Sequence, residues 1–381
     1  MNEKNTAAIK KPKALTVGSV MIDIITVVAD NDIELMTMHN MTSSFLMLEQ
    51  GRKIEAESIS TYVGGGAANA AVSLSRLGLE AEVLALVGDD INAEKVMKCF
   101  NDEKVGSRYV KTSHKAGTGI AVNLSSHNRN AAIFTHRGAN THLTEEQVRS
   151  VDFSEYDMAY ITSLSNESAL SFPLIIKSAS DAGCFVVSNP GIRQLTHKCD
   201  SFLASLKSID LLGINTVECA TLVPHLVSGN CHGLSLPDSA HSEILPPLLK
   251  NGFKIGGFSL GLVETMCSLS QLGPKYVVVT DGEYGAYLFH DNCLYFCPPQ
   301  EAEMLGSAGA GDSFTSALAA AVCTGKDPAT ALFSAASNAA SVISYVDTQT
   351  GLLTKAEMQD IIARTTIQNE TKCWVLNTAE E

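Results

Sequence analysis

The chain has 381 residues, of which 45% are hydrophobic and 18% charged, a composition typical of a folded globular protein. Its formal net charge of −14 argues against a nucleic acid or an anionic membrane as a partner, because no basic stripe offsets the acidic excess. No run reaches the roughly 18 apolar residues that a membrane span needs, and the start of the chain is too polar for a signal peptide. The ten cysteines lack the spacing of a disulfide scaffold, so we expect free thiols in the cytoplasm.

The elements predicted from hydrophobic periodicity begin with a buried strand over residues 14–25, which ends in a polar tip at Asp23. The next elements are a strand over 59–63, a helix over 67–77, a strand over 81–87, a helix over 91–100, and a hairpin formed by 118–126 and 131–136. Further strands are predicted over 157–162, 183–188, 209–214 and 275–281. Helices alternate with these strands over 167–181, 192–206 and 215–223.

This alternation predicts an α/β fold with a doubly wound, mainly parallel sheet that helices cover on both faces. The strand-rich segments 27–63 and 118–136 interrupt the alternation, and we expect them to form a small β lid over the sheet. Residues 224–256 are irregular and contain several prolines, which predicts an insertion. The expected boundaries are one domain over 14–352 and loosely held tails over 1–13 and 366–381.

The most informative motif runs from Gly306 to Phe314, with the sequence GSAGAGDSF, and opens a helix of small apolar residues. Glycines before a helix let successive N–H groups point into one concavity, and the helix N-terminus adds a partial positive charge, so the place suits a phosphate. The carboxylate of Asp312 would repel that anion unless it accepts a proton from a hydroxyl that attacks the phosphorus. The alternative is that Asp312 caps the helix, and the motif alone leaves the two interpretations about even.

A second glycine cluster and an acid lie where doubly wound sheets place their ligands, at strand ends and helix starts. Gly64, Gly65 and Gly66 suit either a close approach of the backbone to a ligand or tight packing of a strand against a helix. Asn69 follows them and offers both a donor and an acceptor. Asp23 is either a turn acid or an acceptor for substrate hydroxyls.

Two more clusters follow strands in the second half of the chain. Glu218 comes one turn after Asn215, either as a first-turn acid that the helix dipole favours or as an organiser of hydrated magnesium. Thr280, Gly282 and Gly285 follow a buried strand, where hairpin geometry and contact with a nucleotide explain them equally well.

Taken together, these motifs resemble the ribokinase-like (PfkB) carbohydrate kinase family over residues 14–352. The segments that carry the resemblance are Gly64 to Gly78, Val87 to Asp90, Arg137 to Asn140, the N-x-x-E motif of Asn215 and Glu218, the T-x-G-x-x-G turn from Thr280 to Gly285, and Gly306 to Phe314. The resemblance implies transfer of a phosphoryl group from ATP to a hydroxyl of a small sugar. A nucleoside kinase on the same fold is the alternative, since the lid side chains decide specificity.

The resemblance also implies a role for each matching residue. Asp312 would be the general base, and the backbone amides of Gly309, Ala310 and Gly311 would stabilise the transferring phosphoryl group. Glu218 would organise magnesium. The acceptor would be held by Asp23, Gly65, Gly66 and Asn69. The nucleotide site would be lined by Asn215, Thr280, Gly282, Gly285 and Asn338.

One departure from the family pattern bears on cofactors. Gly306-Ser307-Ala308 stands where the family has D-T-T, so the acid that would support a monovalent cation such as K⁺ is missing, and backbone carbonyls would have to hold it. A nucleotide-binding dehydrogenase is disfavoured because no G-x-G-x-x-G follows the first strand. A non-catalytic binding protein is disfavoured because Asp312 and Glu218 occur together. We expect a homodimer, since the lid strands would otherwise expose an edge.

Overall fold

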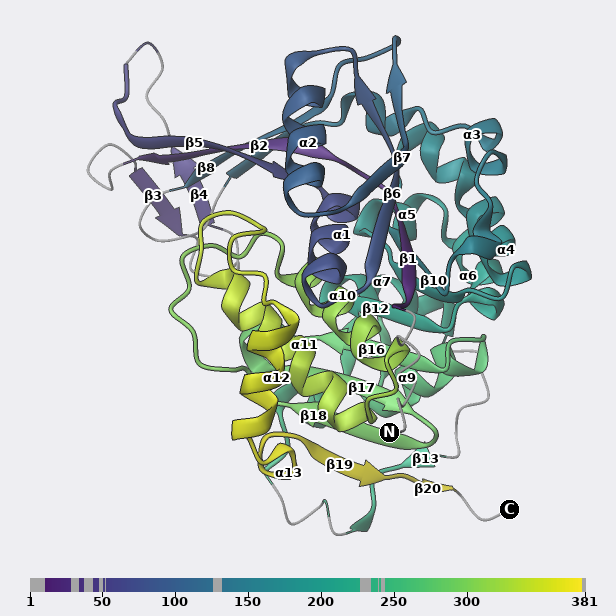
Figure 1. The fold of residues 1–381 in the computed structure, drawn as a ribbon. Helices are drawn as coiled ribbons and strands as arrows, with labels where there is room; N and C mark the ends of the chain where they lie inside the picture. Colours follow the sequence, from purple (N-terminus) through teal and green to yellow (C-terminus); the bar gives the residue numbers. More distant parts are fainter. Residues whose placement is uncertain are drawn as a thin grey trace, which may run out of the picture.

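The computed structural model describes residues 11–28, 34–37, 44–47, 51, 53–125, 132–226, 234–238, 240 and 244–378. Its central feature is a ten-stranded sheet in the order β19-β18-β17-β16-β12-β11-β10-β1-β6-β7 (Figure 1). Strands from β16 to β7 in this order pair in parallel, and antiparallel pairing joins β16, β17, β18 and β19 at the other edge. The predicted mainly parallel sheet is therefore confirmed. Its strands are β1 (Lys13–Val17), β6 (Glu80–Gly88), β7 (Gly106–Ser113), β10 (Met158–Thr162), β11 (Phe185–Asn189), β12 (Leu211–Asn215), β16 (Tyr276–Thr280), β17 (Ala286–His290), β18 (Cys293–Cys297) and β19 (Lys372–Val375).

Helices cover both faces of this sheet, as predicted. One face is contacted by α1 (Gly66–Arg76), α10 (Ala310–Cys323) and α11 (Pro328–Ile343). The other face is contacted by α4 (Phe172–Asp181), α7 (Thr216–Leu226) and α9 (Leu262–Gln271). The other described α-helices are α2 (Ile91–Asp102), α3 (Glu145–Arg149), α5 (Ile192–His197), α6 (Cys199–Ser205), α8 (Pro247–Asn251), α12 (Lys355–Arg364) and α13 (Ile367–Glu370).

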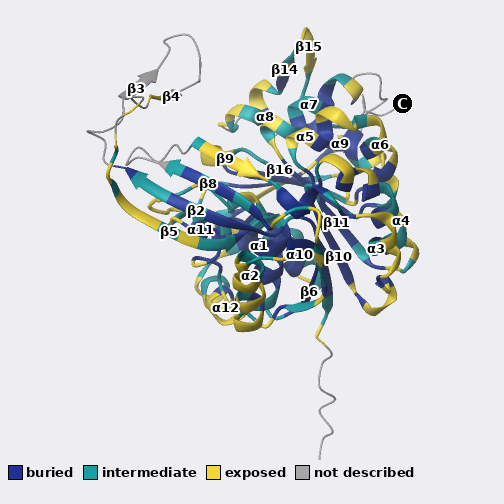
Figure 2. Cartoon of the chain, turned by 90° about the horizontal axis from the view of Figure 1, so that it is seen from above, coloured by how far each residue is buried: buried dark blue, intermediate teal, exposed yellow. Residues whose placement is uncertain are grey.

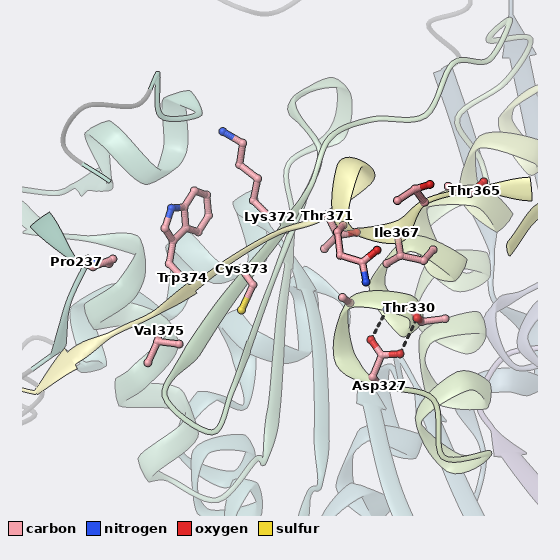
Figure 3. Close-up of a pocket in the computed structure, with 13 residues that line it drawn as sticks. Pro237, Asp327, Thr330, Thr365, Ile367, Thr371, Lys372, Cys373, Trp374 and Val375 are labelled. Atoms are coloured by element: carbon pink, nitrogen blue, oxygen red, sulfur yellow. Dashed lines mark hydrogen bonds between the residues drawn. The ribbon is translucent and has the colours of Figure 1, made fainter. Parts of the chain in front are cut away.

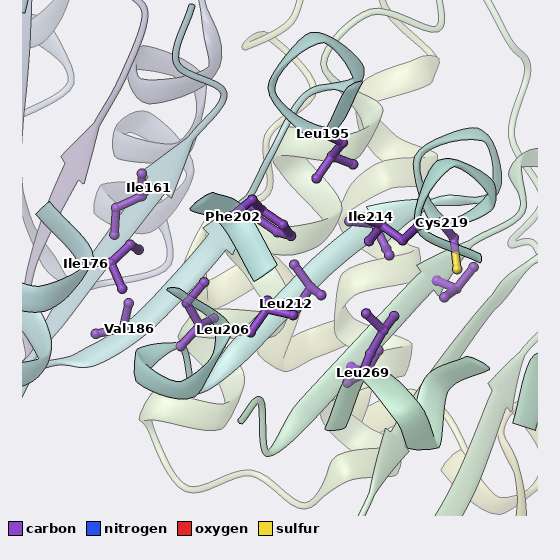
Figure 4. Close-up of a cluster of buried hydrophobic side chains, with 14 of the residues drawn as sticks. Ile161, Ile176, Val186, Leu195, Phe202, Leu206, Leu212, Ile214, Cys219 and Leu269 are labelled. Atoms are coloured by element: carbon purple, nitrogen blue, oxygen red, sulfur yellow. The ribbon is translucent and has the colours of Figure 1, made fainter. Parts of the chain in front are cut away.

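Alternating side chains of each buried strand divide between two hydrophobic clusters, one on each face. In β12, Leu212 and Ile214 join the cluster that also contains Ile161 and Val186 (Figure 4), whereas Leu211 belongs to the cluster on the opposite face. Successive residues of a strand point to opposite faces, so a strand buried on both sides must be apolar throughout. This is why these strands are recognisable as continuous apolar runs.

A separate four-stranded sheet projects from one side of the molecule (Figures 1 and 2) and contains the segments predicted as a lid. Its strands, in the order β5-β2-β8-β9, are β2 (Met21–Val28), β5 (Ala56–Gly64), β8 (Gly119–Ser125) and β9 (Ala132–His136). The predicted hairpin is formed by β8 and β9, which pair antiparallel. A short hairpin of β3 (Glu34–Thr37) and β4 (Ser44–Met47) lies within the first lid segment.

The predicted single strand over 14–25 is wrong, because the chain leaves the main sheet at Gly18. The backbone φ of Gly18 is +151°, and a Cβ atom at this position would collide with Thr162. The chain turns there and enters the second sheet as β2. Asp23 therefore lies within a strand, paired with Tyr62 and Ala121, and not at a strand end. Apolar residues resume directly after Gly18 and Ser19, so the two strands read as one in the sequence.

Three other predictions need correction. Strand β7 was not predicted, and the expected helix over 192–206 is two helices, α5 and α6, on either side of Lys198. The segment 366–378 is not a loose tail, because it forms α13 and then β19, which pairs with β18 at the sheet edge. Trp374 and Leu376 are both buried in the same hydrophobic cluster as Leu212 and Ile214, and this burial holds the segment in place.

The predicted insertion over 224–256 is described only in part. Helix α7 continues to Leu226, and the segment then contains β13 (Leu234–Ser235), α8 and β14 (Phe253–Ile255), which pairs with β15 (Phe258–Leu260). Strand β13 pairs with β20 (Asn377–Thr378) near the end of the chain. Residues 227–233, 239 and 241–243 lie outside the described residues, as do residues 1–10 of the predicted N-terminal tail. No helix within the described ranges is long and apolar enough to cross a membrane.

Candidate active site

The N-terminus of α10 is shaped by Gly309, which is its N-cap residue. Gly309 has a left-handed φ of +78°, and a Cβ atom there would lie 2.8 Å from the Cβ atom of Thr348, so only glycine fits without strain. No side chain of the described residues caps this helix. Its first N–H groups are therefore left to an anion or to water, which is the property predicted from the motif.

Asp312 lies in the first turn of α10 and is not its cap, so the helix-cap alternative does not describe this carboxylate. Its side chain is partly buried, and Oδ2 accepts a hydrogen bond of 2.9 Å from Nδ2 of Asn69 on α1. Burial raises the pKa of Asp312 above its usual range, and the Asn69 hydrogen bond lowers it in part. A carboxyl group with a raised pKa holds an abstracted proton more firmly, which suits a general base.

Asp23 lies on β2, near enough to Asp312 for the charge of that carboxylate to act on it. It is only 7% exposed and packs so closely against Gly64 that a Cβ atom on this glycine would collide with its Oδ2 atom. The pKa of Asp23 is raised to about 7, mainly by burial and in smaller part by the negative charges of Asp312 and Asp347. The second sheet thus brings Asp23 to α10, although the two residues are far apart in the sequence.

Glu218 is a first-turn acid of α7, as one of the two interpretations of the sequence held, and its role toward magnesium stays a prediction. Its Oε2 atom accepts a 3.0 Å hydrogen bond from the backbone N–H of Asn215, while its own N–H donates to Oδ1 of Asn215 at 2.8 Å, a reciprocal cap of α7. Burial is the main reason that the pKa of Glu218 is raised to about 7, and the charge of Asp312 acts in the same direction against the Asn215 hydrogen bond. The residue therefore caps a helix and also lies close to Asp312.

Gly65 and Gly66, which precede α1, occupy positions where a larger residue would not fit without strain or loss of space. Gly65 has a φ of +94°, and a Cβ atom there would lie 2.6 Å from the carbonyl oxygen of Ser19. The N–H of Gly66 donates to Oγ of Ser19 at 3.2 Å, and a Cβ atom on Gly66 would lie 3.3 Å from Oδ1 of Asp312. The tight-packing alternative therefore holds for Gly65, while Gly66 also keeps the space beside Asp312 open.

The cluster of Thr280, Gly282 and Gly285 lies next to Asn215 and Glu218 at the carboxyl edge of the sheet. Thr280 is paired with Asn215 across β16 and β12, which places the predicted nucleotide residues side by side. Gly282 has a φ of +56° with open space around it, whereas a Cβ atom on Gly285 would collide with the carbonyl oxygen of Cys297. Of these two glycines, Gly282 has room for a ligand and Gly285 is required by the hairpin.

Asn338 does not lie where the sequence placed it. Its side chain is 0% exposed, which leaves no surface for the predicted contact with a nucleotide. Nδ2 donates to the carbonyl oxygen of Ser313 at 2.9 Å, and Oδ1 accepts from the N–H of Leu353 at 2.9 Å. Asn338 thus ties α11 to the first turn of α10.

The segment Asp347-Thr348-Gln349, which three residues separate from the end of α11, was missed by the sequence analysis. Thr348 Oγ1 and Gln349 Nε2 both donate to Oδ1 of Asn69, at 2.9 and 3.2 Å, and Asp347 is buried beside Asp23. In the sequence, only a short polar stretch after a helix marks this segment. No motif spacing connects it to the glycine-rich clusters.

Comparison with known proteins identifies the family. The model of the pfkB family carbohydrate kinases matches residues 11–230 and 261–355. The chain belongs to this family. Both the resemblance inferred from the motifs and the predicted enzyme class are thereby confirmed.

Individual pfkB-family relatives are distant. Fructosamine kinase FrlD of Bacillus subtilis is 24% identical over 283 residues, which cover 73% of this chain and 83% of that protein. The structure of Arabidopsis thaliana ribokinase with ribose and ATP superposes with a TM-score of 0.67 at 19% identity, over 93% of this chain and 100% of that one. The structure of a Burkholderia thailandensis nucleoside kinase in complex with inosine gives a TM-score of 0.67 at 17% identity, over 94% of this chain and 98% of that one. At these identities the structural likeness establishes the ribokinase-like fold.

The pfkB-family site suits a magnesium ion that is shared with phosphates. No group of three or more His, Cys, Asp or Glu side chains that could hold a metal occurs in the described part of the chain. Mg²⁺ usually keeps several waters and binds one or two carboxylates together with substrate phosphates, so it needs no such cage. Glu218 fits this role, because Asn215 occupies one carboxylate oxygen and the charge nearby at Asp312 would be offset by a cation.

A large cavity lies elsewhere in the fold. It has a volume of about 1160 Å³ and lies near the N-terminal end of α11, where its lining includes Asp327, Thr330, Thr371, Lys372 and Trp374 (Figure 3). None of the residues predicted for catalysis lines it. We place the active site at the start of α10, on the basis of the hydrogen bonds and charges described above.

Proposed function

We propose that this pfkB-family protein transfers the γ-phosphoryl group of ATP to a hydroxyl of a small sugar, with Asp312 as the general base. The observation that carries the proposal is the place of Asp312: it stands beside an uncapped helix N-terminus, is held by Asn69, and does not cap its own helix. A carboxylate beside an anion site is unfavourable unless it has a chemical task there.

In this mechanism, Asp23 accepts hydrogen bonds from sugar hydroxyls and so orients the acceptor. Asp312 takes the proton of the attacking hydroxyl as its oxygen bonds to the γ-phosphorus and the bond from this phosphorus to the ADP oxygen breaks. The N–H groups of Gly309, Ala310 and Gly311 stabilise the negative charge on the transferring group. Glu218 would hold magnesium together with the nucleotide, and the ion would supply positive charge to offset that of the phosphates. Thr280 and Gly282 are proposed to contact the nucleotide.

The sugar and ATP assignments rest on the carbohydrate kinase family and on neighbours such as the ribokinase solved with ribose and ATP. The test is an ADP-release assay over a panel of sugars and nucleosides, with a magnesium-free control. A sugar that supports ADP release above the nucleosides agrees with the proposal. Preference for a nucleoside would favour the alternative kinase, and no ADP release with any acceptor would favour a non-catalytic binding protein. Repeating the assay in K⁺-free buffer tests the monovalent-cation prediction.

Replacing Glu218 with glutamine is expected to raise the magnesium concentration needed for half-maximal activity by about 10–100-fold, with little change in the acceptor KM. Glutamine keeps the cap of α7 but removes the charge that would hold metal-bound water. The matched control is Glu264→Gln, since Glu264 caps α9 in the same way through the N–H of Gly261 at 2.9 Å. Superimposable magnesium titrations for Glu218→Gln and the parent would leave Glu218 as a helix cap alone.

The lid and the homodimer stay predictions. Ile59 on β5 and Ile133 and Phe134 on β9 are exposed at the two edges of the second sheet, by 67%, 57% and 63%. Apolar side chains on unpaired edge strands favour association, and we propose a dimer through this sheet. Light scattering of the parent and of Phe134→Lys tests this, because the substitution should produce monomers. A parent that is monomeric at all concentrations would refute the dimer.

A further inference from the structure

The amide of Asn69 is the link between the proposed base and the C-terminal part of the chain. It is 3% exposed, and its Nδ2 atom donates to Oδ2 of Asp312 at 2.9 Å. Its Oδ1 atom accepts two hydrogen bonds, from Thr348 Oγ1 at 2.9 Å and from Gln349 Nε2 at 3.2 Å. An amide oxygen has two lone pairs, so Thr348 and Gln349 use its full capacity as an acceptor.

These two donors decide which end of the amide faces Asp312. If the amide turned over, its oxygen would face the carboxylate of Asp312, and two acceptors would meet without a proton between them. Its nitrogen would at the same time face the Nε2 donor of Gln349. The donors therefore hold Asn69 in the one orientation that supports the base.

The segment that carries Thr348 and Gln349 is itself held firmly. Arg76, at the end of α1, donates from Nη1 to the carbonyl oxygen of Gln349 at 2.7 Å and forms an ion pair of 2.7 Å with Glu103. The Cβ atom of Thr348 packs against Gly309, the N-cap of α10. Both ends of helix α1 thus contact the segment, one through Asn69 and the other through Arg76, while Thr348 packs against the N-cap residue of α10.

We propose that Thr348 and Gln349 are positioning residues, which act through Asn69 to hold the Asp312 carboxylate in place for proton abstraction. This inference rests on the proposed function of Asp312. It assigns a catalytic consequence to a segment that contacts neither the reacting hydroxyl nor the phosphate in the proposed mechanism.

The kinetic test uses isosteric variants. Thr348→Val keeps the methyl group that packs on Gly309 and removes only the hydroxyl, and Gln349→Met removes the amide donor. Each is expected to lower kcat by about 3–10-fold with little change in the acceptor KM, the range for one lost hydrogen bond. Thr348→Ser, which restores the hydroxyl, should recover most of the loss. Thr350→Val makes the same chemical change two residues further on, at an exposed side chain, and should behave as the parent.

A double-mutant cycle shows whether the effect passes through Asn69. Thr348→Val is expected to add no further loss of kcat in an Asn69→Ala background, because the link is already broken. Full additivity would overturn the proposal, as would parent-like kcat in both Thr348→Val and Gln349→Met, or an equal loss in Thr350→Val. Thermal unfolding checks that each variant folds. If Gln349→Met does not fold, the result for Thr348→Val alone decides the proposal.

A spectroscopic readout separates this inference from the proposed function. In the protein without substrates, the side-chain amide resonances of Asn69 should shift in Thr348→Val and stay unchanged in Thr350→Val. Unchanged Asn69 resonances in Thr348→Val would overturn the inference whatever the activity. If the parent releases no ADP with any acceptor, the proposed function fails, while the resonances still show whether Thr348 orients the amide.

Discussion

Replacing Asp312 with alanine is expected to lower kcat by about 10²–10⁴-fold, the usual span for the loss of a positioned general base. Binding of ATP should change little, because the N–H groups at the start of α10 belong to the backbone and remain in place. The measurement is kcat at saturating acceptor and ATP, together with ATP affinity from calorimetry. Asp312→Asn, which keeps the size of the side chain, should show the same loss of kcat.

The matched control for this experiment is Asp327, which is a true helix cap. Asp327 accepts a 3.0 Å hydrogen bond from the N–H of Thr330 at the start of α11. Asp327→Ala should reduce the free energy of unfolding by about 1 kcal/mol and leave kcat as in the parent. If Asp312→Ala behaves in this way instead, Asp312 supports the fold and not the chemistry.

Replacing Asp23 with asparagine is expected to weaken acceptor binding by about one to two orders of magnitude for each hydrogen bond to the charged carboxylate that is lost. ATP affinity should barely change, because the proposed nucleotide residues Thr280 and Gly282 lie at the end of another strand. Calorimetric titration of each ligand measures both effects. Equal losses for acceptor and ATP would contradict the acceptor role and indicate a general defect of the site.

The same variant should be more stable than the parent at pH 8. The pKa of Asp23 is raised from 3.8 to about 7 in the folded protein, so the folded state binds a proton more tightly than the unfolded chain. Stability is therefore lost as the pH rises from about 4 to about 7, by up to about 4 kcal/mol. Asparagine removes this penalty, and the stability of parent and variant should converge below pH 4. Denaturant unfolding from pH 4 to pH 8 measures the free energy of unfolding of both proteins. A difference in this free energy that stays constant across the range would contradict the prediction.

A stabilising substitution that also destroys acceptor binding would show that the second sheet holds an unfavourable charge for the sake of function. Asp23 is buried next to Gly64 and close to two other acids, an arrangement that folding alone does not favour. A sugar hydroxyl would donate a proton to this carboxylate and compensate its lost hydration. Because Asp23 is buried, we expect its charge to lower the stability of the free protein and to strengthen binding of the acceptor.

The sequence alone determined the features that depend on local patterns. Continuous apolar runs alternating with helical periods predicted the parallel sheet, because a strand buried on both faces must be apolar throughout. The glycines before Asp312 predicted the open helix N-terminus, because only glycine adopts the left-handed backbone found at Gly309 without strain. Asp23, Glu218 and Asp312 were expected to share one site, and the charge of Asp312 acts on both Asp23 and Glu218.

Only the tertiary structure decided how the chain changes sheets and what holds the proposed base. The turn lies between β1 and β2, two apolar segments that are both largely buried, and only Gly18 and Ser19 interrupt the apolar pattern there. This short interruption does not show that the two strands belong to different sheets. Burial of Trp374 and Leu376 holds β19 against β18, whereas the composition of the tail predicted no order. Thr348 and Gln349 hydrogen-bond to Asn69 across 279 and 280 residues of sequence. Contacts between segments so far apart depend on the packing of α1, α10 and α11 together, which hydrophobic periodicity within each helix does not encode.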